Sequence, residues 1–280
     1  MKKLPVLITI ILMAFCIVKV NNATANSFGS NVTIYDGAGY TAFGQGGEDQ
    51  ETEDACVNSQ TWDLEGFFLD GTKLTIVGGF DFENGADDPY RAPTSSYDYH
   101  YHSGDIFIDV DGDASYGTAN NNTGGGLTSV NDTFGYDYAL VLDFSDKTYD
   151  IYSLNSASVL KVWFGENEGS NPWRYDSGGS LESQDNGFEY LTGLTDAYTG
   201  FKGLSHNSLT VDLGFLDPGT KFISHFTMEC GNDNLMGKGT TPASSHDPVV
   251  PEPGTIILFG SGLVGFAAFA RARKSRSSGS

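Results

Sequence analysis

The stretch that decides the fold is W-D-L-E-G-F-F-L-D-G-T-K-L-T-I-V-G-G-F-D-F, residues 62–82. Two runs rich in aromatic and aliphatic residues, 62–69 and 73–82, flank Asp70-Gly71, and an Asp-Gly pair between such runs is a strong hairpin signal. Alternation in the second run predicts that one face of its strand carries four apolar side chains, Leu74, Ile76, Phe80 and Phe82. The stretch therefore predicts an antiparallel hairpin with one face in the core.

Six more short runs have the same character and are predicted strands: 105–110, 138–144, 148–154, 159–164, 208–213 and 221–229. Gly-, Asn-, Pro- or acid-rich segments separate them and are predicted loops: 44–54, 83–96, 114–131 and 165–187. The segment 225–233 is predicted to be the last strand and its turn. Many short strands without an amphipathic helix predict an all-β fold, a single antiparallel β-sandwich or jelly roll of about 220 residues.

The charge of the chain is strongly acidic. Its 280 residues carry 36 acids and 15 bases, for a net charge of -21. Three bases precede residue 26 and four follow residue 270, so residues 26–253 keep all 36 acids with eight bases and a charge near -28. Clustered Lys and Arg are missing there, which excludes a nucleic-acid partner. Such a charge favours divalent cations over anionic glycans.

The N-terminal segment is a predicted signal peptide. Lys2 and Lys3 precede an apolar run at 4–18, and Ala23-Thr24-Ala25 has the small residues that signal peptidase recognises. We expect cleavage after Ala25, which removes residues 1–25.

The C-terminal segment has three parts. The string Val250-Pro251-Glu252-Pro253 comes first, an apolar stretch at 254–270 follows, and a basic cluster ends the segment: Arg271, Arg273, Lys274 and Arg276. The apolar stretch would be about 26 Å long as a helix, the short end of what spans a bilayer. The basic end is expected to stay cytoplasmic, which leaves residues 26–250 outside.

This order of motif, apolar helix and basic tail resembles the PEP-CTERM sorting signal of exosortase substrates, over residues 248–276. The resemblance implies a Gram-negative bacterium, an inner-membrane precursor, and an exosortase that cuts near Pro251 to Pro253. It also implies delivery to the cell surface or to an extracellular polysaccharide matrix. Residues 26–247 would then be the exported β-sandwich ectodomain.

Two cysteines survive removal of the signal peptide, which takes Cys16 with it. A pair in an exported chain most simply forms one disulfide, here between Cys56 and Cys230. Two buried thiols are the alternative.

The acidic string G-D-I-F-I-D-V-D-G-D-A-S-Y-G, residues 104–117, is the strongest candidate site. On an extended backbone four carboxylates point to one side: Asp105, Asp109, Asp111 and Asp113. Their mutual repulsion favours a bound calcium ion, which accepts six to eight oxygen ligands. Asp137 and Asp143, on the predicted neighbouring strand, are further candidate ligands.

The string departs from an EF-hand loop, because Gly is fourth, Ala is sixth and Asn120 is twelfth. With the following Tyr-Asp-Tyr-Ala-Leu, at 136–140, it resembles calcium-containing carbohydrate-binding β-sandwich modules. A solvated acidic loop is the alternative.

Aromatic residues near the loop 165–172 form a second candidate. Exposed Trp163, Trp173 and Tyr175 would stack on sugar rings, whereas the alternative is that they pack in the core. Glu166 and Glu168 in that loop are a conceivable glycosidase pair, although nothing in the sequence fixes the separation that such catalysis needs.

His100 and His102 lie on one face of an extended segment and could ligate a transition metal, but no third ligand is identifiable. Ordinary loop residues are the alternative.

The leading hypothesis is a non-catalytic surface or matrix protein whose calcium-stabilised sandwich contacts glycans or mediates adhesion. A secreted polysaccharide hydrolase is the first rival. An ice-binding protein is the second, but the repeated Thr-x-Thr array that such a protein needs is missing from the sequence.

Overall fold

The computed structural model describes residues 28–34, 57, 59–94, 98–115, 128–163 and 170–243. In this part of the chain the regular structure is almost entirely β-strand, and the one α-helix described is α1 (Asp196–Thr199). Two short 3-10 helices accompany it, η1 (Gln60–Trp62) and η2 (Asn131–Thr133). The described strand pairs are antiparallel, which confirms the all-β prediction.

The predicted hairpin consists of β3 (Leu64–Asp70) and β4 (Lys73–Gly78). Asp70 pairs with Lys73, so the two-residue turn is Gly71-Thr72, and Gly71 has a φ of 62°. Glycine at the first turn position tolerates this left-handed conformation without steric strain. The four side chains predicted to share one face are all buried in the same core, which confirms the alternation.

The hairpin lies inside a five-stranded sheet with the order β1-β3-β4-β15-β14. The other strands of this sheet are β1 (Ser30–Asn31), β14 (Glu189–Leu194) and β15 (His206–Asp212).

A seven-stranded sheet has the order β13-β10-β9-β7-β16-β17-β2. Its strands are β2 (Thr33–Ile34), β7 (Ile106–Asp109), β9 (Tyr138–Asp143), β10 (Thr148–Ser153), β13 (Ser180–Gly187), β16 (Lys221–Thr227) and β17 (Asn234–Thr240). Two small sheets complete the fold, formed by β8 (Thr128–Val130), β11 (Val159–Lys161) and β12 (Arg174–Ser177), and by β5 (Ala86–Asp87) and β6 (His100–Tyr101).

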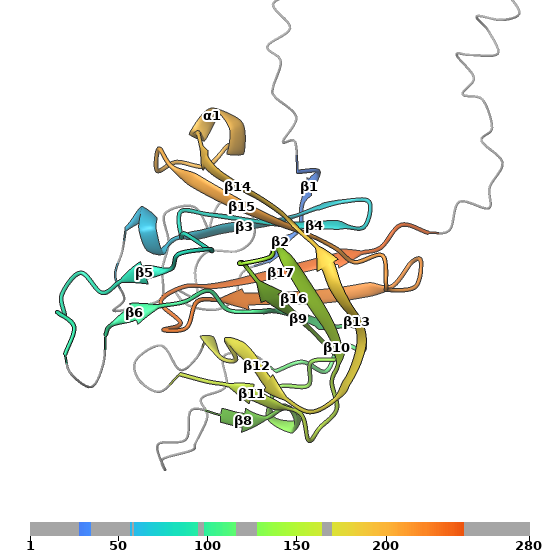
Figure 1. The fold of residues 1–280 in the computed structure, drawn as a ribbon. Helices are drawn as coiled ribbons and strands as arrows, with labels where there is room; N and C mark the ends of the chain where they lie inside the picture. The colour runs from blue at the N-terminus through green and yellow to red at the C-terminus, as the bar shows by residue number, and fades with distance from the viewer. Residues whose placement is uncertain are drawn as a thin grey trace, which may run out of the picture. The chain divides into compact units, whose positions relative to one another are not determined.

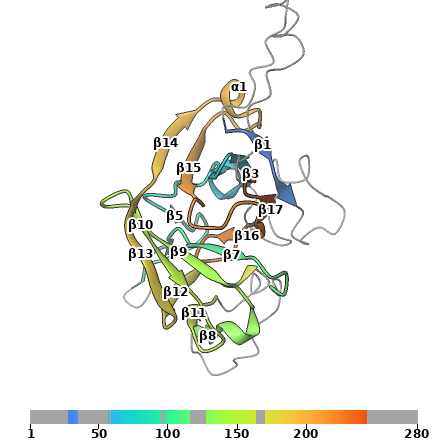
Figure 2. The same cartoon turned by 90° about the vertical axis from the view of Figure 1, so that its right-hand side faces the viewer.

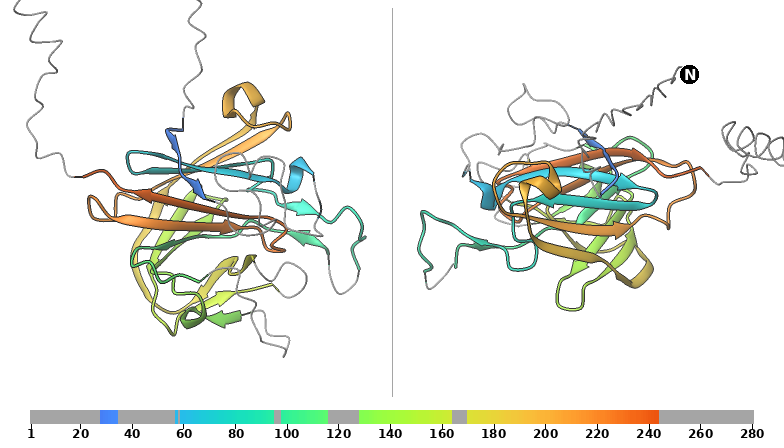
Figure 3. Two further views of the ribbon diagram at one scale, coloured as in Figure 1. Left: turned by 180° about the vertical axis from the view of Figure 1, so that it is seen from behind. Right: turned by 90° about the horizontal axis from the view of Figure 1, so that it is seen from above.

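The three larger sheets form layers, with the seven-stranded sheet between the other two (Figures 1 and 2). The view from behind shows the same order (Figure 3). One core joins the five- and seven-stranded sheets and includes Phe67 and Ile76 from the first with Ile106 and Phe226 from the second. Burying each such side chain contributes about 1.5–3 kcal/mol. Two sheets that share a core in this way are sandwich-like.

A second core fills the space between the seven-stranded and the three-stranded sheet. Phe107 and Tyr136 contribute from one side, and Leu160 and Val162 from the other. Strand β7 is consequently buried on both faces, which explains why its four residues are all inaccessible. Its Ile106 and Ile108 face the main core, as the sequence predicted.

Four predictions about strand positions are wrong. The predicted loop at 83–96 contains β5, the loop at 114–131 contains β8, and the loop at 165–187 contains β12 and β13. The segment 225–233 is not the last strand, because β17 follows it.

None of the helices in the described ranges is long and apolar enough to cross a membrane. The predicted signal peptide and the predicted C-terminal helix lie outside these ranges, so both remain predictions.

Candidate functional site

The end of β7 is shaped by the carboxylate of Asp109. Its Oδ1 accepts hydrogen bonds from the backbone N–H groups of Asp111 (3.0 Å) and Gly112 (2.8 Å), and its Oδ2 accepts one from Ala114 (3.3 Å). Gly112 has a φ of 88°, which glycine adopts readily. The chain therefore turns tightly around the Asp109 side chain immediately after the strand.

Strand pairing brings Asp137 to the same place. Ile108 on β7 pairs with Tyr138 on β9, so the next positions, Asp109 and Asp137, are neighbours at this end of the sheet. Asp137 Oδ2 accepts a hydrogen bond of 2.6 Å from the backbone N–H of Val110.

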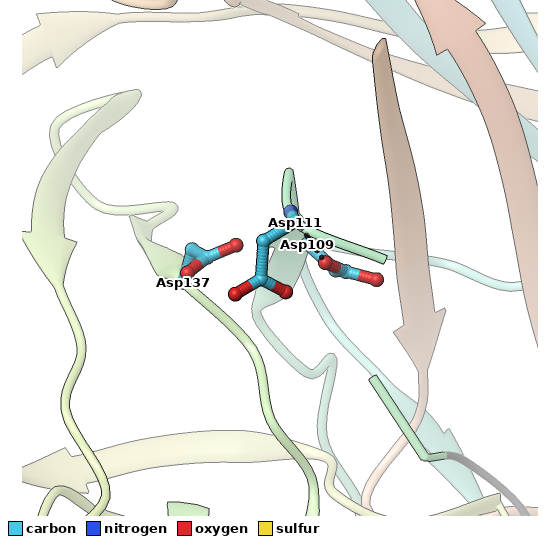
Figure 4. A group of neighbouring side chains, drawn as sticks. All are labelled: Asp109, Asp111 and Asp137. Atoms are coloured by element: carbon cyan, nitrogen blue, oxygen red, sulfur yellow. Dashed lines mark hydrogen bonds between the residues drawn. The ribbon is translucent and has the colours of Figure 1, made fainter. Parts of the chain in front are cut away.

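Asp109, Asp111 and Asp137 form an acidic cluster in which one carboxylate oxygen from each lies within 4.8 Å of the others (Figure 4). Asp109 is buried, Asp111 is exposed and Asp137 is intermediate. Calcium binds carboxylate oxygens at about 2.3–2.6 Å, so two ligands of one ion lie at most about 5 Å apart. The spacing of the cluster fits a single calcium ion.

The charges of these carboxylates oppose one another. Burial raises the pKa of Asp137, and the charges of Asp111 and Asp109 raise it further. The pKa of Asp113 is also raised, first by its hydrogen bond with Asp111 and then by the charge of Asp111. A cation among these groups would relieve the repulsion. The structure thus brings four of the five predicted ligands to one loop region.

Asp105 does not join them, which corrects the sequence prediction. It precedes β7, four residues from Asp109, and its oxygens accept hydrogen bonds from the backbone N–H groups of Leu142 (3.0 Å) and Tyr175 (2.9 Å). Arg174 Nε lies 3.9 Å away. Burial raises the pKa of Asp105 to about 6, although the charge of Arg174 opposes this shift. Asp105 joins the seven- and three-stranded sheets.

Asp143 is also outside the cluster. It lies at the far end of β9, where its Oδ1 accepts hydrogen bonds from the backbone N–H and the hydroxyl of Ser145, at 2.8 and 2.6 Å. The suggestion that Asp143 is a further ligand is therefore wrong.

Two of the three predicted platform aromatics line one hollow, of about 330 Å³. Trp163 is half-buried there and Trp173 is buried, and Lys161, Arg174, His102 and Glu229 complete the polar lining. Tyr175 is directed elsewhere, because its ring stacks on Tyr152 at 4.4 Å and its hydroxyl donates to the Gly178 carbonyl at 2.7 Å. The two tryptophans thus share one hollow and Tyr175 does not, and the low exposure of Trp173 agrees with the alternative that it packs in the core.

A second hollow, of about 440 Å³, shares His102 and Arg174 with the first. Ser103 lines it, and the Ser103 Oγ is buried without a hydrogen-bond partner among the described residues. The sequence analysis did not identify Lys161, Arg174 or Ser103. The sequence offered one indication of Lys161 and Arg174, namely that bases are rare in this acidic chain.

The histidine pair does not form a metal site. The Nδ1 of His100 lies 2.6 Å from Asp87 Oδ1, and its Nε2 lies 2.7 Å from the Asn84 carbonyl oxygen. Both ring nitrogens therefore face oxygen acceptors, and the hydrogen bond to Asp87 is the main cause that raises the pKa of His100. Because a histidine ligand needs a free nitrogen lone pair, His100 cannot ligate a metal in this arrangement.

A buried polar group centred on His206 was not predicted from the sequence. His206 lies between two carboxylates, with its Nδ1 2.7 Å from Glu65 Oε2 and its Nε2 3.0 Å from Asp196 Oδ1. Glu65 and His206 are fully inaccessible. The only available signal was a lone glutamate inside the apolar run 62–69.

Several predicted residues lie outside the described ranges: Cys56, Glu166, Glu168, Val250, Pro251, Glu252 and Pro253. Cys230 is described and is buried.

Fold and site together define an all-β protein with an acidic loop and an aromatic, basic hollow. Residues 249–274 match the model of the PEP-CTERM protein-sorting motif, and the chain is a PEP-CTERM protein. No curated protein and no solved structure matches it at a significant level. The motif makes the chain an exosortase target, exported as a membrane-anchored precursor that becomes surface-associated.

Proposed function

We propose that this chain is a non-catalytic surface or extracellular-matrix protein of a Gram-negative bacterium, in which a calcium-stabilised β-sandwich contacts extracellular polysaccharide. Signal peptidase removes residues 1–25, and exosortase cuts near Pro251 to Pro253 within the inner membrane. The ectodomain at 26–247 is the part that reaches the surface.

The observation that carries the proposal is the acidic cluster. Three carboxylates from two segments, Asp109 and Asp111 after β7 and Asp137 before β9, lie close enough to share one ion. Asp113 is the candidate fourth ligand, because its carboxyl interacts with that of Asp111. A calcium ion there would tie the end of β7 to the start of β9. It would thereby stabilise the middle sheet next to the second core.

The two buried histidines argue against a histidine-dependent esterase or protease, whereas a glycosidase would use a pair of carboxylates instead. General bases in hydrolases are most often histidines with a nitrogen available for the nucleophile. His206 contacts a carboxylate through each nitrogen, and His225 contacts the Pro172 carbonyl oxygen (2.8 Å) and the Met236 sulfur (3.2 Å). These two buried rings hold the fold together through these contacts.

A glycan-array screen of the full chain in mild detergent, with calcium and with a chelator, tests the proposal. We expect a defined class of glycans to be bound in calcium and bound less well in the chelator. Release of shortened oligosaccharides would instead favour the hydrolase. Absence of binding to every glycan under both conditions would overturn the polysaccharide contact.

A further inference from the structure

The hollow lined by Trp163 and Trp173 holds an unusual pair of charges. Lys161 on β11 and Arg174 on β12 are direct cross-strand partners. Like charges directly opposite each other on an antiparallel pair are destabilising. The two residues are also two of only eight bases in residues 26–253, which carry 36 acids. Such a pairing of scarce bases needs a reason other than stability.

Among the described residues, the negative charge beside this pair comes from the buried Asp105 and from Glu229. The carboxylate of Asp105 lies 3.9 Å from Arg174 Nε, longer than a direct hydrogen bond. Lys161 forms no ion pair among the described residues, and its Nζ lies 5.9 Å from the centroid of the Trp173 ring. Glu229 is the carboxylate among the described residues that line the hollow. Lys161 and Arg174 thus bring two positive charges to one side of the hollow, partly offset by Asp105 and Glu229.

The aromatic wall adds a surface suited to a sugar ring. Trp163 is half-buried, and its ring meets Tyr101 edge-on at 5.5 Å and 87°, which fixes its orientation. Trp173 is only 7% exposed and forms the floor below Lys161. The apolar faces of pyranose rings pack on indole rings, and the charge of a substituent on that ring would be met by the two bases.

We propose that this hollow binds acidic sugar residues of a polysaccharide, with a uronate carboxylate between Lys161 and Arg174 and a sugar ring against Trp163. The inference rests on the proposed glycan contact and narrows it to one class. It also reverses the expectation, drawn from net charge alone, that the domain avoids anionic glycans. At physiological salt the Debye length is about 8 Å, so acids farther away than this are largely screened, while Asp105 and Glu229 compete with a bound carboxylate for the two bases.

The second hollow differs in charge from the first, because five carboxylates line it: Glu83, Asp143, Asp146, Asp150 and Asp185. It shares His102 and Arg174 with the first, and Ser103 presents there a buried hydroxyl that has no partner in the described part of the chain. A sugar hydroxyl next to the bound uronate could exchange a hydrogen bond with it. The two volumes, about 330 and 440 Å³, lie in the usual range of small-ligand sites. The acidic sugar is therefore placed in the first hollow, and the second hollow suits the hydroxyl groups of a neighbouring sugar better than its carboxylate.

The test uses tetramers of galacturonate, glucuronate and mannuronate, each as the free acid and as its methyl ester. Calorimetric titration of the full chain in mild detergent gives the affinities. We expect at least one acid to bind about tenfold more tightly than its ester, because the ester removes the charge and leaves the ring. Lys161→Gln is expected to weaken binding of the acid about tenfold and to leave the ester unchanged.

Lys238→Gln is the matched control, because it removes the same charge from an exposed position on β17 outside both hollows. Circular dichroism melts confirm that both lysine variants fold. The variant Trp163→Leu separately tests the contact between the indole and the sugar ring. Equal affinity for acid and ester, or equal effects of the two lysine variants, would overturn the inference while leaving the glycan contact in place. The inference would also be overturned if no uronate bound. The proposed function would be overturned only if the protein bound no glycan on the array.

Discussion

Val57 and Asn232 are joined by two hydrogen bonds across 175 residues of sequence. The backbone N–H of Val57 donates to Asn232 Oδ1 at 2.9 Å, and Asn232 Nδ2 donates to the Val57 carbonyl at 3.1 Å. Asn232 is buried and follows β16 in the turn that leads to β17. The segment before β3 is thus fixed against the last hairpin of the seven-stranded sheet.

This contact motivates a prediction about the cysteines. Cys56 precedes Val57 and Cys230 lies two residues before Asn232, so peptide mapping without reductant is expected to recover a Cys56–Cys230 disulfide. Its removal by a double Cys→Ala substitution should lower the free energy of unfolding by about 2–5 kcal/mol, the usual range for a long loop. Complete alkylation of both thiols in protein that has not been reduced would refute the bridge.

A second prediction concerns acid and the buried His225. Burial lowers the pKa of His225 to about 4, from 6.5 in a model peptide. The unfolded chain therefore takes up this proton at higher pH, and stability falls as the pH drops from about 6.5 to 4, by up to about 3 kcal/mol. Asp105 has the opposite effect on stability. Its pKa in the folded state is raised to about 6, so its contribution to the free energy of unfolding increases as the pH falls.

His225→Gln removes only the first of these two effects. We expect the variant, whatever its stability at pH 7, to lose about 2–3 kcal/mol less than the unsubstituted protein between pH 7 and pH 4.5. Urea unfolding at the two pH values measures this difference. An identical loss in both proteins would mean that His225 does not titrate as its burial implies.

The third prediction concerns sorting. The motif at 249–274 makes the chain an exosortase target, so we expect surface-released protein to lack residues 254–270. Glu252→Ala is expected to leave the precursor in the inner membrane. Intact-mass measurement of the released protein and fractionation of the variant check both statements, and released protein that retains the tail would contradict them.

The strands that the sequence predicted are rich in buried aromatic and aliphatic side chains. β4 alternates at Leu74 and Ile76, whereas β3 and β7 carry consecutive buried apolar residues, so each is visible as an apolar run. β13 has the sequence S-L-E-S-Q-D-N-G and is mostly exposed at the edge of its sheet, so nothing in its hydrophobicity indicates a strand. It forms by pairing with β10, across two register irregularities that no local pattern predicts.

β17 was missed for a different reason. A Cβ added to its Gly237 would lie 2.9 Å from the Phe67 ring of the opposite sheet and 2.5 Å from the Oγ of Ser224, its partner on β16. Glycine usually indicates a loop in a sequence, whereas here it permits close packing of two sheets. Only the tertiary arrangement distinguishes these two roles.

The candidate site, like the fold, was predicted only in part from the sequence. Regular spacing of aspartates identified the loop after β7, and adjacency of the next strand identified Asp137. Asp105 was misassigned because an extended segment of four residues covers about 13 Å, which places its two ends in different surroundings. Lys161 and Arg174 became recognisable only when β11 and β12 were seen to pair.

The measurement that tests the central claim most directly is thermal unfolding of the full chain in calcium, in magnesium and in a chelator. At a hundredfold excess over Kd, calcium bound by the acidic cluster stabilises the fold by about 2.7 kcal/mol, which corresponds to a Tm increase of about 5–10 °C for a domain of this size. Magnesium should raise the Tm much less, because it requires a tighter octahedral site. Asp111→Asn should abolish most of the calcium effect, whereas Asp217→Asn, an equal change of charge at an exposed position elsewhere, should preserve it. Identical melting curves in calcium and in chelator would contradict the account and leave the cluster as a solvated acidic loop.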